Sequence, residues 1–101
     1  MHIQVITFKL EGIDDAAYQA HAEQNAPVFA AMSGLRAKIW LANRQAGTYG
    51  GIYTWDDVAA MRAYQEGKVF QGLQANPHLT DVAVRDFAVL AEPTKVTRGG
   101  Y

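Results

Sequence analysis

Residues 2–10 (HIQVITFKL) alternate between two sets of side chains, and both sets are largely apolar. Ile3 and Val5 belong to one set, and Ile6 and Phe8 belong to the other. A period of two is the pattern of a β-strand, in which successive side chains point to opposite faces. A strand that is apolar on both faces is usually covered on both. The pattern therefore predicts a first strand with a cover on each face.

A helix is predicted next, from just after Asp14 to about residue 32. Asp14 has the side chain of an N-cap, and Gly34 suits the left-handed residue that often follows a helix. His21 and Asn25 are four residues apart, so they share a face of this helix, on or beside its apolar stripe. The apolar stripe consists of Tyr18, Ala22, Val28, Phe29 and Met32.

Two strands joined by a short polar loop follow this helix. They are predicted over residues 35–42 (LRAKIWLA) and 48–55 (TYGGIYTW), where β-branched and aromatic residues are frequent. The loop over residues 43–47 ends in glycine, as hairpin loops often do. Symmetric pairing about this loop would place Trp40 opposite Gly50, where the large ring would cover the glycine.

The second of these strands turns at once into another helix. Asp56 is its candidate N-cap, and Val58, Met61 and Tyr64 then recur at helical spacing. A shorter helical piece follows over residues 68–75, until the residue before a proline ends it.

The last strand is predicted over residues 80–90 (TDVAVRDFAVL), and the polar tail over residues 92–101 is expected to be extended. The order is β-α-β-β-α-β, the ferredoxin-like arrangement of an α+β protein. It predicts a single domain over residues 1–101, with a four-stranded antiparallel sheet and both helices on one face. The other sheet face is bare yet apolar, which marks an interface. A second copy is the simplest cover, so we expect a homodimer through the sheet faces.

The composition excludes several partners and chemistries. The chain has 101 residues, a formal net charge of −1 and 9 lysines and arginines, which form no run. Binding to nucleic acid is therefore not expected. Without cysteine there is no disulfide, thiolate nucleophile or cysteine metal site. No segment has the pattern of a membrane span or a secretion signal, which predicts a cytoplasmic protein without membrane contact.

His21 and Asn25 form the best polar pair for chemistry. A histidine can act as a base or orient a phenol, and an asparagine can polarise a carbonyl or enolate oxygen. The alternative is that the pair caps the seam between helix and sheet or faces solvent. No ligand cluster indicates a metal site, and no glycine-rich phosphate loop follows a strand.

We expect this pair to share a pocket between the helices and the sheet with a set of apolar and aromatic residues. For the aromatic members of the set, packing in the core is the alternative role. The expected substrate-binding residues are Phe29, Tyr53, Trp55, Tyr64, Phe70 and Leu73.

Three segments of the chain resemble a known family. They are SGLRAKIWL, TYGGIYTWDDVAAMRAY, and NPHLTDVAVRDFAVL with the tail after it, and TYGGIYTW is the most specific part. Together with topology and length they resemble the dimeric α+β barrel superfamily and its YdhR-like branch, whose members are described as monooxygenases. The resemblance spans nearly the whole chain and implies the fold and the dimer. Its wider relatives include antibiotic-biosynthesis and heme-degrading monooxygenases and muconolactone-isomerase-like proteins, so it implies no single chemistry.

The resemblance also permits one comparison with the heme-degrading relatives. Counted from Trp55, their tryptophan late in the second helix falls on Tyr64, and their histidine in the short helix falls on Gln74. Glutamine is a poor axial ligand for heme iron. The asparagine of their first strand has no counterpart in HIQVITFKL. The comparison argues against heme degradation by that arrangement.

The resulting hypothesis is a homodimeric, cofactor-independent monooxygenase that binds a small flat apolar or aromatic molecule. An electron-rich substrate that forms a carbanion can itself react with oxygen, so the protein need only bind it, deprotonate it and exclude water. Two alternatives stay open. One is a non-catalytic dimer that binds a small molecule, and the other is an isomerase or cyclase that uses the same pocket for proton transfer.

Overall fold

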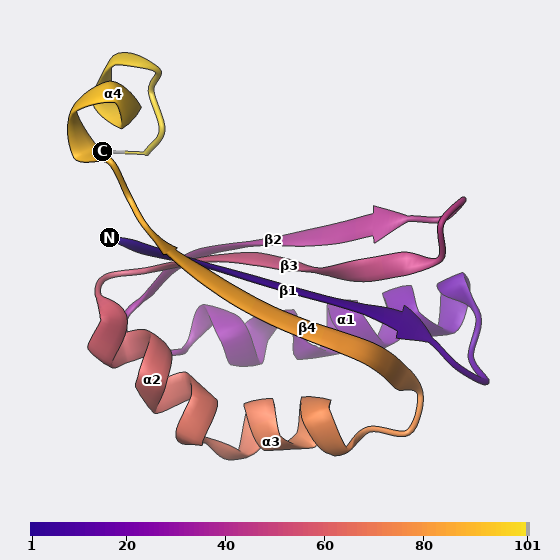
Figure 1. Cartoon of the computed structure of the whole chain (residues 1–101). Helices are drawn as coiled ribbons and strands as arrows, with labels where there is room; N and C mark the ends of the chain where they lie inside the picture. The colour runs from indigo at the N-terminus through magenta and orange to yellow at the C-terminus, as the bar shows by residue number, and fades with distance from the viewer. Residues whose placement is uncertain (101) are drawn as a thin grey trace.

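The computed structural model, which describes residues 1–100, is an antiparallel sheet with helices on one face (Figure 1). The strands lie in the order β2-β3-β1-β4, and each neighbouring pair is antiparallel. The predicted β-α-β-β-α-β ferredoxin-like arrangement is confirmed, with α2 and α3 at the place of the second helix. The elements are β1 (His2–Leu10), α1 (Asp15–Ala30), β2 (Leu35–Asn43), β3 (Thr48–Trp55), α2 (Val58–Glu66), α3 (Lys68–Ala75), β4 (Leu79–Ala88) and α4 (Ala91–Val96).

Aspartates begin both of the longer helices. The Asp14 carboxylate accepts a hydrogen bond from the backbone N–H of Ala17 at 2.8 Å, as predicted for the N-cap of α1. The N-cap of α2 is Asp57, however, and not Asp56 as predicted. The reason is that the Asp56 carboxylate instead accepts a hydrogen bond from Nε of Arg36 at 2.6 Å.

The core lies between the sheet and the helices α1, α2 and α3 (Figure 1). Aromatic side chains dominate it, because large rings bury the most apolar area per residue. One polar side chain, Gln4, is also fully buried there, and its Oε1 accepts a hydrogen bond from the Trp55 indole N–H at 3.1 Å. The buried hydrophobic residues are Ile6, Phe8, Phe29, Tyr49, Tyr53, Trp55, Met61, Tyr64 and Phe70.

The register of the hairpin differs by one residue from the symmetric pairing expected. Trp40 lies opposite Gly51, and Gly50 lies opposite Leu41. The reason is that Asn43 pairs with Thr48 and extends β2, which leaves an even-numbered loop of residues 44–47. Because paired residues share a sheet face, Trp40 points toward the helices rather than toward the open face.

The face of the sheet away from the helices is open in the chain described (Figure 1). It carries large apolar side chains, among them Ile39 and Phe87, whose exposed fractions are 59% and 54%. These two residues lie on the edge strands β2 and β4. Ile52 on β3 and Val5 on β1 pair with each other and continue the same face between the edges, so this face carries an apolar patch.

The tail differs from the extended conformation expected. Residues Ala91–Val96 form the short helix α4, which lies beyond the end of the sheet (Figure 1). Pro93 sits in its first turn, where the missing N–H would have no partner in the helix. Tyr101, the last residue of the predicted tail, lies outside the described residues. In residues 1–100 no helix is long and apolar enough to cross a membrane.

Candidate functional site

A cavity of about 380 Å³ opens between α1, α3 and the helix-covered face of the sheet. Phe29, Trp40 and Tyr53 give it an aromatic wall. His21 and Asn25 line it from α1. Small-molecule sites commonly combine a mostly apolar concave wall with a few polar groups, so this cavity is the candidate site.

His21 and Asn25 are hydrogen-bonded to each other. Nδ2 of Asn25 lies 2.9 Å from Nε2 of His21 and donates to the His21 carbonyl oxygen at 3.0 Å. Since the amide nitrogen has only hydrogens to offer, Nε2 accepts and the ring proton resides on Nδ1. The i, i+4 spacing on α1 produces this contact. The pair therefore presents a ring N–H and an amide oxygen for further hydrogen bonds.

Lys38 is a third polar group in the cavity, and the sequence analysis did not select it. Its ammonium nitrogen Nζ lies 3.4 Å from the ring centroid of Phe29, 3.4 Å from that of Trp40 and 4.6 Å from that of Tyr53. A cation this close to aromatic faces is attracted by their quadrupoles. Burial nevertheless lowers the pKa of Lys38 to about 7.

Gly51, in the neighbouring strand β3, leaves the space that the Lys38 side chain occupies. A Cβ atom at Gly51 would lie 2.9 Å from Cε of Lys38, which is closer than such atoms approach. The missing side chain lets the lysine stem cross β3 toward the rings. Alternation along β2 could have shown that Lys38 and Trp40 share a face, but not that three rings from different elements converge there.

The structure places the expected substrate-binding residues in two groups. Phe29, Tyr53 and Leu73 line the cavity with His21 and Asn25. The remaining three form a second group away from the cavity lining. Of these, Trp55 and Tyr64 line a different hollow of about 260 Å³, and Phe70 is buried against the Tyr64 ring at a centroid distance of 5.4 Å.

Tyr53 and Tyr64 connect the two groups. Their hydroxyl oxygens are 3.5 Å apart and their ring centroids 5.5 Å apart. Burial raises the pKa of both phenols, most strongly for Tyr53, so both are protonated near neutral pH. They can donate a hydrogen bond but not serve as phenolate bases.

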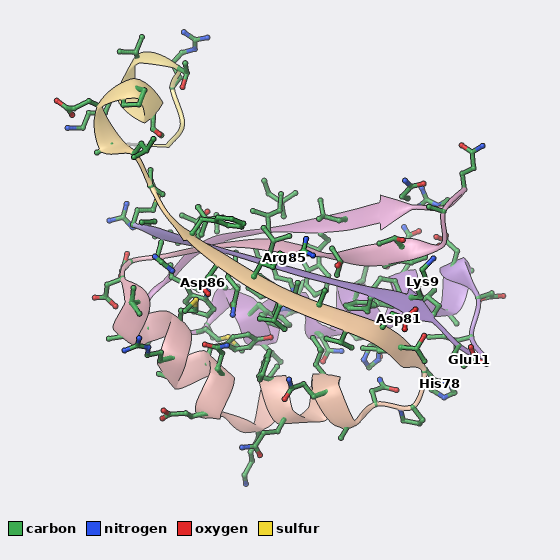
Figure 2. The ribbon with its side chains drawn as sticks, viewed as in Figure 1. Lys9, Glu11, His78, Asp81, Arg85 and Asp86 are labelled. Carbon is green, nitrogen blue, oxygen red and sulfur yellow. The ribbon has the colours of Figure 1, made fainter. Side chains whose placement is uncertain are left out.

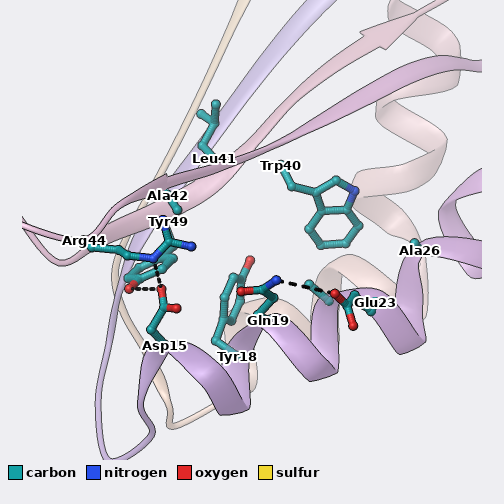
Figure 3. A pocket seen from close by; sticks show the side chains of 11 residues that line it. Asp15, Tyr18, Gln19, Glu23, Ala26, Trp40, Leu41, Ala42, Arg44 and Tyr49 are labelled. Atoms are coloured by element: carbon teal, nitrogen blue, oxygen red, sulfur yellow. Dashed lines mark hydrogen bonds and ion pairs between the residues drawn. The ribbon is translucent and has the colours of Figure 1, made fainter.

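A second cavity of about 330 Å³ adjoins the first on the other side of Tyr18 and Trp40, which line both (Figure 3). In it the Asp15 carboxylate accepts a hydrogen bond from the Tyr49 hydroxyl at 2.7 Å and pairs with Nε of Arg44 at 3.0 Å. The Tyr49 hydrogen bond is the main cause that lowers the pKa of Asp15. These charges satisfy one another, so the cluster ties α1 to the β2–β3 hairpin.

The two other histidines, His2 and His78, lie outside both cavities. His2 is buried, with Nε2 at 2.6 Å from an Asp86 carboxylate oxygen. His78 contacts the Glu11 carbonyl oxygen through Nδ1 at 2.8 Å, at the end of the sheet where Figure 2 labels both residues. Across residues 1–100, no three histidine, aspartate or glutamate side chains gather as a metal site would require.

Comparison with protein families gives one clear match. Residues 3–100 match the family model described as "Putative mono-oxygenase ydhR". No protein with a curated description matches the chain.

Solved structures with the same fold come from several bacteria. One is described as a putative antibiotic biosynthesis monooxygenase from Deinococcus radiodurans, with TM-score 0.73 and 18% identity over 88% of this chain and 92% of that one. SnoaB, a cofactor-independent oxygenase from Streptomyces nogalater, has TM-score 0.70 and 22% identity over 87% and 91%. The heme-degrader MhuD from Mycobacterium tuberculosis, solved with two hemes bound, has TM-score 0.71 and 16% identity over 89% and 96%. At these identities the similarity shows the shared fold.

Proposed function

The chain belongs to the ydhR mono-oxygenase family, and on that premise we propose that it oxygenates a small flat apolar or aromatic molecule without a cofactor. The observation that carries the proposal is the cavity of about 380 Å³ with an aromatic wall and the polar groups of His21, Asn25 and Lys38. A flat substrate would stack on the rings while its oxygen atoms meet the polar groups.

The proposed reaction uses molecular oxygen as the oxidant and an activated CH₂ group as the reductant. The CH₂ carbon loses a proton, and the carbanion donates electrons to oxygen and forms a C–O bond. Loss of water from the resulting hydroperoxide leaves a carbonyl group. One oxygen atom is then in the product, and the other leaves as water with the two substrate hydrogens. The protein's share is to bind, to accept a proton and to exclude water.

His21 is the proposed base and Asn25 its partner. In the structure Nε2 of His21 already accepts from the Asn25 amide at 2.9 Å. The proposal therefore requires the substrate to displace this amide, after which Asn25 is free to donate to the substrate oxygen.

Heme fits the residues present poorly. Gln74, at the position of the heme-degraders' histidine, is exposed and does not line the cavity. His21 is the one histidine in the cavity lining within residues 1–100, and its unprotonated nitrogen is occupied by Asn25. Heme iron takes an imidazole, thiolate, thioether or phenolate ligand. Among the described residues, the cavity lining has no cysteine or methionine, and burial raises the pKa of the Tyr18 and Tyr53 phenols, so neither is a phenolate near neutral pH. We therefore propose no step through heme.

We further propose that the protein works as a homodimer joined through the open sheet faces. The exposed Ile39 and Phe87 support this, because a second copy would bury both. The tail over residues 92–101 is proposed to lie against the partner. Val96 on α4 is 78% exposed, and α4 has no buried residue in the single chain.

A second candidate is a dimer that binds a small molecule without converting it. The specific observation in its favour is the mutual hydrogen bond of His21 and Asn25, which occupies the nitrogen a base would use. Turnover separates the two candidates.

The experiment measures oxygen uptake with anthrone, a flat tricyclic compound with an acidic CH₂ group, in the presence of a chelator and without added flavin or heme. We expect uptake above the uncatalysed rate, with anthraquinone as product. His21→Ala should lower kcat by about 100-fold or more if His21 is the base. Its stability should change little, because His21 is exposed.

His78→Ala is the matched control, since it removes a histidine outside the cavity. It should retain the wild-type kcat. Wild-type turnover in His21→Ala would remove the catalytic assignment of His21. Binding of anthrone without any oxygen uptake by the wild type would favour the non-catalytic candidate.

A further inference from the structure

Lys38 carries a positive charge when protonated, and no negatively charged side chain in the described part of the chain is paired with it. Within residues 1–100 it takes part in no ion pair and no side-chain hydrogen bond. Its ammonium group is instead held by the faces of Phe29, Trp40 and Tyr53. Lys38 is half-buried, and a cation that is partly removed from water is favoured by a negative partner, so its three unused N–H donors in a cavity leave room for an acceptor on a ligand.

The remainder of the cavity reinforces this charge. Its lining includes a second lysine, Lys68 from α3, and contains no aspartate or glutamate. The adjoining cavity contains two carboxylates. Asp15 is paired with Arg44 and accepts a hydrogen bond from Tyr49, and Glu23 accepts one from Gln19. The cavity therefore offers a positive, partly dehydrated end beside an aromatic wall.

We propose that Lys38 binds the substrate as an oxyanion, so that the cavity selects a planar phenol or enol in its deprotonated form. This inference deepens the proposed function by naming its substrate class, and it rests on that function for its catalytic meaning. The aromatic body of the ligand stacks on the rings, and the phenolate or enolate oxygen accepts hydrogen bonds from the Lys38 ammonium.

The binding step can also transfer the proton. When Lys38 arrives neutral, the ligand O–H bond breaks and the proton joins the lone pair on Nζ. The products are an ammonium group and an oxyanion in contact, and no other reactant is needed. The pKa of about 7 favours this exchange with an acidic phenol, since the two groups then compete evenly for one proton.

Each element around Lys38 contributes titratable or charged groups that bear on the pH dependence. Arg36 precedes it on β2 and is paired with the Asp56 carboxylate at 2.6 Å. The other titratable groups line the cavity, and none of them is a carboxylate. They are His21 and Tyr18 from α1, Tyr53 from β3 and Lys68 from α3.

The test uses para-nitrophenol, whose phenolate absorbs at a longer wavelength than the phenol, and para-nitroanisole, which has the same ring but no acidic proton. Titrations are done without oxygen at about pH 6, where free nitrophenol is mostly neutral. Wild-type protein should bring up the phenolate band on binding. As the pH rises and Lys38 loses its proton, affinity for the phenolate should fall.

Lys38→Met removes the charge and keeps an unbranched side chain that is only one atom shorter. It should abolish the phenolate band and weaken nitrophenol binding roughly tenfold or more, because a charge-assisted hydrogen bond is lost. Its affinity for nitroanisole should match that of the wild type, which shows that the cavity has kept its shape. Gly51→Ala retains the charge but crowds Cε of Lys38, so it should weaken nitrophenol binding more than nitroanisole binding.

Lys9→Met is the matched control, because Lys9 is an exposed strand lysine outside the cavity. It should leave both affinities unchanged. The proposal is overturned if Lys38→Met binds nitrophenol as tightly as the wild type and with the same spectrum, or if the wild type binds it only as the neutral phenol. Since no turnover is measured, this failure is separate from a failure of anthrone oxygenation, which would leave the phenolate site intact.

Discussion

At the scale of the residue, the charge of Lys38 is costly to the folded protein. Burial lowers its pKa from 10.5 to about 7, so the folded state releases a proton that the unfolded chain keeps up to higher pH. Stability contributed at residue 38 should therefore rise with pH between these two values, and the full cost of the charge should be present below about pH 7.

Lys38→Met tests this sign. The variant should be more stable than the wild type at about pH 6, and its advantage should shrink as the pH approaches 10. Urea unfolding of both proteins across that range measures the difference in free energy of unfolding. An advantage that is constant with pH would show that Lys38 has an ordinary pKa.

The sequence allowed one part of the polar site to be predicted and not the other. His21 and Asn25 belong to one helix, whose regular spacing puts residues four apart in contact. Lys38 depends on rings brought by α1 and β3 and on the space above Gly51, which are tertiary relationships. The expected hairpin register was wrong by one residue and paired Trp40 with Gly50 instead of Gly51, the glycine that lies beside Lys38.

At the scale of the element, one ring of α2 packs against aromatic side chains from three other elements. Tyr64 is 6% exposed and lies near the rings of Phe29, Tyr53, Trp55 and Phe70, at centroid distances of 6.1, 5.5, 5.2 and 5.4 Å. These neighbours come from α1, β3 and α3, so Tyr64 joins three elements to α2. Helical spacing predicted that Tyr64 would lie in apolar surroundings and line the cavity. The structure places it in the core, outside the cavity lining.

Tyr64→Ala should therefore cost roughly 3–5 kcal/mol of stability, as large-to-small changes of buried aromatic residues do. Tyr64→Phe removes only a hydroxyl whose contact with the Tyr53 hydroxyl is long, at 3.5 Å, and should cost less than about 1 kcal/mol. Chemical unfolding of both variants distinguishes the contribution of the Tyr64 ring to stability from that of its hydroxyl group. A similar loss in both variants would mean that the hydroxyl contact holds the helix.

At the scale of the whole molecule, the open sheet face is where we propose that a second copy binds. Phe87 from β4 is 54% exposed on the single chain, and a partner would bury it. Phe87→Glu would then place an unpaired carboxylate inside the interface, which is strongly unfavourable. We expect the wild type to sediment as a dimer at micromolar concentration and this variant as a monomer.

Val28→Glu is the matched control for that experiment. Val28 is 46% exposed on α1, on the helical side of the molecule, so a charge there should leave sedimentation unchanged. A wild-type monomer, or a Phe87→Glu dimer, would contradict the proposed assembly. The open face was foreseeable from strands that are apolar on both sides. The α4 helix was not, because it is too short to show a periodic pattern.

Tyr18 and Trp40 line both cavities, so a substitution at either position could change the size of the molecules that fit. Trp40 also holds Lys38, so its replacement would alter binding chemistry and cavity length together. Tyr18 has no contact with Lys38 among the ring contacts described, and it stands between spaces of about 330 and 380 Å³. Ala22 also lines both cavities, but its side chain is already small. On the proposed function, we expect a smaller residue at position 18 to connect the two spaces and admit longer molecules, while the polar groups proposed to bind their oxygen atoms stay unchanged.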